Sequence, residues 1–60
     1  MDKFNLIGVR ILENSELNHT RYFEIGNLKE AIEYAKGYES CGYTYHFICC
    51  DKYGNYLCEL

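Results

Sequence analysis

One helical segment between two pairs of β-type segments limits the folds open to this chain. Apolar residues recur at helical spacing over residues 27–39, while the runs on either side are short and rich in β-forming residues. A length of 60 residues suffices for one domain. We therefore predict a single α+β domain over residues 1–60, ordered β-β-α-β-β, with a four-stranded antiparallel sheet and one amphipathic helix packed on one face.

The first pair of strands is expected to form a hairpin. The run Phe4–Leu12 predicts a strand in which Ile7, Val9 and Ile11 share one face. Phe4 and Leu6 fall on the other face, so either both faces are covered or a bulge near Gly8 changes the phase. Residues 13–19 are polar and predict a turn, and Thr20–Ile25 predicts the second strand.

The helix has clear start signals and two candidate ends. Asn27 is a good N-cap residue, and Glu30 follows three positions later, where a capping box places its acid. The predicted inner stripe consists of Leu28, Ala31, Ile32 and Ala35, and it ends at Tyr38 or Glu39. Either Gly37 or Gly42 ends the helix, and the sequence does not decide between them.

The second pair of strands is predicted over residues 43–50 and 56–60, joined by a type I turn at residues 51–54 that closes with Gly54 at positive φ. A four-residue loop pairs Cys50 with Asn55, Cys49 with Tyr56, Ile48 with Leu57, Phe47 with Cys58, His46 with Glu59 and Tyr45 with Leu60. A three-residue loop would shift these partners by one. We prefer the first register because it separates the apolar from the polar face.

Charge and leader features exclude several classes of function. The net charge is −3, and the six basic residues are scattered along the chain, which disfavours nucleic-acid binding. Residues 1–8 lack the pattern of a signal peptide, and no apolar run is long enough for a transmembrane helix. We expect a cytoplasmic protein without a membrane partner, whose cysteines stay reduced.

The four cysteines and two histidines raise the question of a metal site. No Cys-x-x-Cys pair occurs, and the adjacent Cys49 and Cys50 point to opposite faces of a strand. In the preferred register Cys49 and Cys58 lie diagonally, too far apart for an unstrained disulfide. We expect Cys41, Cys49, Cys50 and Cys58 to be reduced and metal-free, and we expect no cofactor.

Catalysis is disfavoured because the pattern offers one acid–base pair, His46 opposite Glu59, and places no nucleophile beside it. His19 falls in the polar loop and is expected to be solvated. The five glycines are isolated, so no phosphate-binding loop is present.

The seven tyrosines are the strongest positive signal, because tyrosine is enriched at protein interfaces. One helix covers one sheet face, so we expect an uncovered apolar face that binds a partner. Its predicted residues are Tyr43, Tyr45, Phe47, Tyr56 and Leu60. Because a 60-residue chain without disulfides or metal has a thin core, we also expect a homo-oligomer, most simply a dimer.

The chain resembles two kinds of known protein. Residues 27–36 followed by Asp51-x-x-Gly54-x-x-Leu57 resemble short bacterial domains of this topology, a likeness that carries no functional residue. In size, acidity and lack of catalytic residues the chain is similar to phage-encoded inhibitors of bacterial immunity. We expect a non-enzymatic binding protein, an inhibitor or regulator that occupies a macromolecular partner. The alternative is an oligomeric sponge that holds a nucleotide-like small molecule between tyrosines, and an enzyme using His46 and Glu59 ranks third.

Overall fold

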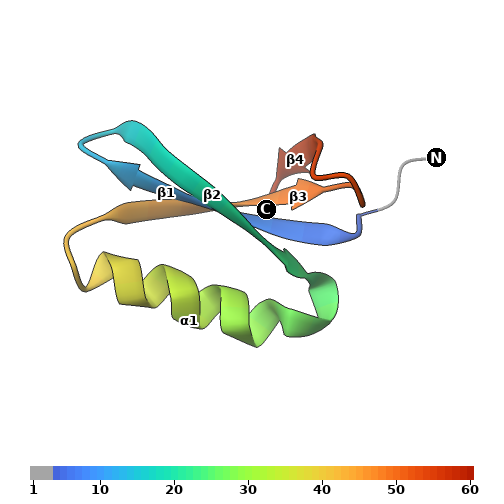
Figure 1. Ribbon diagram of the computed structural model, residues 1–60, viewed down its shortest axis with the longest axis horizontal. Helices are drawn as coiled ribbons and strands as arrows, with labels where there is room; N and C mark the ends of the chain where they lie inside the picture. Colours follow the sequence, from blue (N-terminus) through green and yellow to red (C-terminus); the bar gives the residue numbers. More distant parts are fainter. Residues whose placement is uncertain (1–3) are drawn as a thin grey trace.

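The computed structural model describes residues 4–60 and contains the predicted antiparallel sheet with one helix packed against it (Figure 1). The elements are β1 (Leu6–Glu13), β2 (Glu16–Glu24), a 3-10 turn (Ile25–Asn27), α1 (Leu28–Glu39), β3 (Thr44–Cys50) and β4 (Tyr56–Glu59). The strand order is β2-β1-β3-β4, so β1 and β3 are central and β2 and β4 form the edges. The predicted α+β fold and its element order are confirmed.

The first hairpin is tighter than the sequence predicts. Asn14 and Ser15 both have positive φ, at 53° and 68°, which gives the two-residue turn that suits the twist of antiparallel strands. Consequently β2 already begins at Glu16, and the predicted loop over residues 13–19 is wrong in its second half. The bulge lies away from Gly8: Ile11 pairs with His19 and Leu12 with Leu17, so Asn18 is the extra residue.

The core lies between β1 and α1. Ile7, Val9 and Ile11 alternate along β1 toward the helix and are buried, and the two alanines Ala31 and Ala35 meet them with 0% exposure. Small side chains at both helix positions let the backbone of α1 approach the sheet closely. Leu28 and Ile32, also predicted to face inward, are 45% and 36% exposed, so the buried stripe is rotated toward Tyr34 and Tyr38.

The sequence signal at the start of α1 is not realised, whereas one of the two candidate ends is. Asn27 occupies the N-cap position after a 3-10 turn, but within residues 4–60 its side chain makes no capping hydrogen bond. Gly42 ends the helix: its φ is 95°, its N–H donates to the Glu39 carbonyl, and the Tyr43 N–H donates to the Tyr38 carbonyl. This pair of bonds is a Schellman motif. Gly37 therefore lies inside the helix.

The predicted register of the second hairpin is wrong. Asp51 pairs with Asn55 across a three-residue loop, and the Gly54 N–H donates to the Asp51 carbonyl at 3.0 Å. Gly54 has the predicted positive φ, at 85°. Cys50 then pairs with Tyr56 and Cys49 with Cys58, which leaves Leu57 as a bulge residue. The bulge returns Cys58 and Glu59 to the sheet faces predicted for them, whereas Tyr56 moves to the face of Cys50.

The second hairpin also curls over the sheet face that α1 leaves open. Figure 1 shows β4 and the β3–β4 turn on the side away from α1. A Cβ placed on Gly54 would lie 3.6 Å from the Tyr22 ring, and one placed on Gly8 would lie 2.7 Å from Ile48 Cγ1. Ile48 and Cys50 are buried on this face. The face opposite the helix is therefore partly filled by the chain itself.

Candidate functional site

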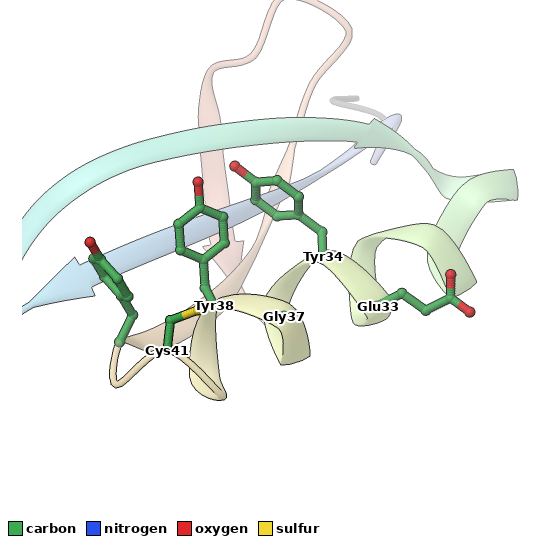
Figure 2. Close-up of a pocket in the computed structure, with 6 residues that line it drawn as sticks. Glu33, Tyr34, Gly37, Tyr38 and Cys41 are labelled. Atoms are coloured by element: carbon green, nitrogen blue, oxygen red, sulfur yellow. The ribbon is translucent and has the colours of Figure 1, made fainter.

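A row of tyrosine rings runs along the side of α1 that faces β2. Tyr34 and Tyr38 are one helical turn apart, and Tyr43 follows the Schellman motif, so the helix and its end bring the three rings together. Ring centroids are 5.1 Å apart for Tyr34–Tyr38 and 5.2 Å for Tyr38–Tyr43, at interplanar angles of 56° and 88°. We call Tyr34, Tyr38 and Tyr43 the tyrosine row. Figure 2 shows Tyr34 and Tyr38 pointing toward β2, with their hydroxyl groups foremost.

His19 on β2 holds the row in place. Its Nδ1 lies 2.6 Å from Asn18 Oδ1, an acceptor, so in the neutral ring Nδ1–H donates to Asn18. Its Nε2 then accepts a hydrogen bond from the Tyr34 hydroxyl, also at 2.6 Å. The His19 ring makes edge contacts with Tyr34 and Tyr38, at centroid distances of 6.1 and 5.2 Å. The expectation of a solvated loop histidine is therefore wrong.

Arg21, two residues along β2, covers the neighbouring rings. Its guanidinium carbon lies 5.1 Å from the centroid of Phe23 and 5.0 Å from that of Tyr34. Such cation–π contacts are worth about 0.5–1 kcal/mol each at exposed sites. Burial, followed by the Tyr38 hydroxyl, raises the pKa of Tyr34, and the Arg21 charge opposes this effect. Tyr34 therefore stays a neutral phenol at physiological pH and serves His19 as a hydrogen-bond donor.

An open pocket of about 700 Å³ lies beside the row (Figure 2). Its lining consists of Glu33, Tyr34, Gly37, Tyr38, Cys41 and Tyr43. Gly37 is the lining residue without a side chain: apart from its own helix backbone and its chain neighbours Lys36 and Tyr38, no atom of residues 4–60 lies within 4 Å of a Cβ built on it. A side chain at position 37 would therefore project into open space beside the tyrosine row.

The structure divides the binding residues predicted from the sequence among different places. Tyr43 belongs to the tyrosine row. Tyr45 and Phe47 are half-buried against the core on the helix side of the sheet, with ring centroids 5.2 Å apart. Tyr56 and Leu60 are 57% and 63% exposed, and Tyr56 pairs with Cys50 on the opposite face. The expectation that all five residues share one open face is wrong.

The predicted acid–base pair does not form in the described part of the chain. His46 lies opposite Arg10 in the β1–β3 pairing, and Glu59 lies opposite Ile48 in the β3–β4 pairing. The cause is the loop and bulge described above, which move Glu59 two positions along β3.

The cysteines likewise differ in one respect from expectation. All four carry free thiols, and Cys49 lies directly opposite Cys58 rather than diagonal to it. The predicted separation of this pair is therefore wrong. Among residues 4–60, the side chains of His, Cys, Asp and Glu nowhere gather in a group of three that could hold a metal ion.

Comparison with protein-family models, with curated protein sequences and with solved structures gives no match to this chain. Within residues 4–60, α1 lacks the length and apolar character that a membrane-spanning helix requires.

Sequence reasoning missed His19, Arg21 and Gly37 as members of the candidate site. The spacing of Tyr34 and Tyr38 is visible in the sequence, because residues four apart share a helix side. Gly37 also carries a signal. If Gly42 ends the helix, Gly37 lies inside it, where glycine lowers helix stability and no local feature of the sequence requires a glycine. His19 and Arg21 carry none, because their contacts with the row depend on how β2 lies across α1.

Proposed function

We propose that this chain is a non-enzymatic binding domain, an inhibitor or regulator that occupies a protein partner through the tyrosine row and the pocket over Gly37. The observation that carries the proposal is Gly37 itself. A glycine inside a helix lowers stability by roughly 0.5–1 kcal/mol relative to alanine. Open space surrounds the position where its Cβ would stand, so packing within residues 4–60 does not require a glycine there. A side chain from a partner would find room at this point.

The chemistry of the lining favours a protein as the partner. Tyrosine rings with hydroxyl tips are over-represented among the residues that contribute most to protein–protein binding. Here three of them line a hollow. His19 contacts Tyr34 and Tyr38, Arg21 lies over Tyr34, and Tyr43 packs on Tyr38, so the rings are positioned in advance. Preorganised side chains lose little conformational entropy on binding, which makes such a surface suitable for a tight complex.

The alternative of a nucleotide sponge receives less support from this geometry. Tyr38 and Tyr43 pack edge-on, and Tyr34 and Tyr38 are tilted by 56°, so these rings do not form a parallel slot for a flat base. Arg21, the cation next to the row, lies over aromatic rings. A sponge would therefore need a slot built between two subunits.

An enzymatic role is also unsupported by the site. Both ring nitrogens of His19 are used, one by Asn18 and the other by Tyr34. His19 would act as a general base toward the Tyr34 hydroxyl, but burial raises the pKa of Tyr34, which makes this phenol hard to deprotonate and a poor nucleophile. We propose no reaction for this chain.

The proposal is tested by filling the pocket. Leucine at position 37 is a much better helix former than glycine, so we expect Gly37→Leu to fold normally and to gain up to about 1 kcal/mol in the free energy of unfolding. The same change should abolish partner binding because the side chain occupies the pocket. Lys29→Leu is the matched control, since it adds the same side chain two helical turns away on an exposed part of α1.

The measurement is capture from a cell lysate by each immobilised variant, with mass spectrometry of retained proteins and of released small molecules. We expect at least one protein to be retained by wild type and by Lys29→Leu and to be lost with Gly37→Leu. An identical set of retained proteins on all three would contradict the proposal. A small molecule released from wild type would favour the sponge instead.

We also propose that the chain self-associates, because a 60-residue domain whose four cysteines are free thiols gains stability from a partner subunit. Leu28, Ile32 and Leu60 remain exposed beyond the pocket. Light scattering of the same variants distinguishes this partner from a foreign one. If the pocket receives a second copy, wild type and Lys29→Leu are dimers and Gly37→Leu has the monomer mass of 7.1 kDa.

A further inference from the structure

Two cysteines face each other across the last two strands, away from the tyrosine row. Cys49 on β3 and Cys58 on β4 are direct partners in an antiparallel pairing. Directly opposed residues in such a pair have Cα atoms about 4.5 or 5.5 Å apart, depending on the hydrogen-bonding position. Both values fall within the usual disulfide range of about 4.4–6.8 Å. The backbone thus already holds the two residues at the separation a disulfide needs.

We propose that Cys49 and Cys58 form a redox modification site, a dithiol that low-molecular-weight disulfides convert reversibly into a cross-strand disulfide. The two thiols differ in a way that suits such an exchange. Cys58 is exposed at the sheet edge, whereas Cys49 is 4% exposed. Cys58 is therefore the thiol that a soluble disulfide reaches first.

The surroundings of Cys49 make it the thiol that reacts second. A hydrogen bond with the Cys58 thiol, then burial, raise the pKa of Cys49 to about 11. Cys49 thus stays protonated and unreactive toward solution reagents until its partner is modified. Once Cys58 carries a disulfide, that hydrogen bond is gone and the neighbouring sulfur is the target nearest to Cys49.

The exchange proceeds in two displacements. The Cys58 thiolate attacks one sulfur of the soluble disulfide, forms a mixed disulfide and releases one thiolate. Cys49 then loses its proton, attacks the Cys58 sulfur and releases the second thiolate. The protein loses two protons and two electrons, and the soluble disulfide takes them up to become two thiols. Excess thiol reverses both steps.

The other two cysteines do not compete for this site. Cys50 points to the opposite sheet face and is fully buried, and burial raises its pKa as well. Cys41 lines the pocket beside the tyrosine row, two residues beyond the end of α1. Replacing Cys41 by serine removes the remaining exposed thiol without touching the pair.

A disulfide between Cys49 and Cys58 would affect β4 most. This strand has four residues, lies at the sheet edge and is bonded to one neighbour, β3. Oxidation would tie it covalently to β3 beside the bulge at Leu57 and fix the register there. In the reduced protein, β4 is held by hydrogen bonds and side-chain contacts alone.

The experiment equilibrates Cys41→Ser protein with glutathione disulfide and maps cysteine-containing peptides by mass spectrometry. We expect a product two hydrogens lighter in which the Cys49 and Cys58 peptides are joined, and a melting temperature about 10 °C above that of the reduced form. Reduction should reverse both changes. Adding Cys49→Ser should stop the reaction at the glutathione adduct of Cys58, and adding Cys58→Ser should leave Cys49 unmodified.

Two results would overturn the proposal. One is a wild-type pair that remains fully reduced at a large excess of glutathione disulfide. The other is a stable glutathione adduct on Cys58 while Cys49 is intact, which would show that the two sulfur atoms do not meet. Neither result would bear on partner binding, because the tyrosine row lies on α1 and in the loop that follows it.

Discussion

Replacing Ala31 with glutamate is expected to leave this domain largely unfolded at 25 °C. Ala31 is 0% exposed and packs with Ile7, Val9, Ile11 and Ala35, all apolar. Glutamate would bring an unpaired carboxylate and added volume into that contact. Burial of an unpaired polar group alone costs about 2–7 kcal/mol, and a domain of this size has roughly 3–5 kcal/mol in total.

Far-ultraviolet circular dichroism and urea titration provide the measurement. Lys36→Glu is the control, since it introduces the same residue at an exposed helix position and should change the free energy of unfolding by less than about 0.5 kcal/mol. A cooperative transition for Ala31→Glu near the wild-type midpoint would mean that α1 meets the sheet through another face.

The second large effect is expected for Gly8→Ala, on the opposite face of β1. The new Cβ would lie 2.7 and 3.0 Å from Cγ1 and Cδ1 of Ile48, and 3.3 Å from the sulfur of Cys50. Ile48 and Cys50 are buried, so neither moves away without disturbing its neighbours. We expect a loss of about 1–3 kcal/mol, which is typical of overpacking.

A double-mutant cycle with Ile48→Ala isolates this contact. If Ile48 fills the space above Gly8, the loss in free energy of unfolding caused by Gly8→Ala should be at least about 0.5 kcal/mol smaller in the Ile48→Ala background than in the wild-type background. Equal costs in both backgrounds, or a gain in stability from Gly8→Ala alone, would contradict the packing described for this face.

The fold was largely predictable because its main signals are local. Alternation in β1, helical spacing around Ala31 and Ala35, and the Asp51–Gly54 turn each depend on neighbours in the chain, and each is confirmed. The choice between Gly37 and Gly42 was open in the sequence because both are compatible with a helix end. The structure decides it through bonds to Glu39 and Tyr38.

The errors occurred where one local irregularity moves many side chains. The bulge at Leu57 lies in a strand of four residues, where alternation is too short to reveal an inserted residue. It moved Glu59 away from His46 and brought Cys58 to Cys49. The cap at Asn27 failed for a different reason, because a 3-10 turn precedes α1 and gives Asn27 dihedral angles of φ −106° and ψ 29°.

The candidate site was only partly predictable. An excess of tyrosine indicated a binding surface, but the sequence alone could not show which rings gather. Tyr43 was predicted to lie on a binding face with residues of the second hairpin but packs on Tyr38 instead, whereas Tyr34 and Tyr38 were assigned to no site. They group because Tyr34 and Tyr38, rather than Leu28 and Ile32, pack beside the buried alanines of α1.

The most direct test of the proposed function uses the tyrosine ring signals in aromatic NMR spectra of the labelled chain. The protein retained by wild type and lost with Gly37→Leu is titrated into the sample. We predict that the ring signals of Tyr34, Tyr38 and Tyr43 shift or broaden, while those of Tyr53 and Tyr56 on the second hairpin stay unchanged. Shifts of the Tyr45 and Tyr56 ring signals, with those of Tyr34 and Tyr38 unaffected, would contradict the proposed binding site and place the partner on the second hairpin.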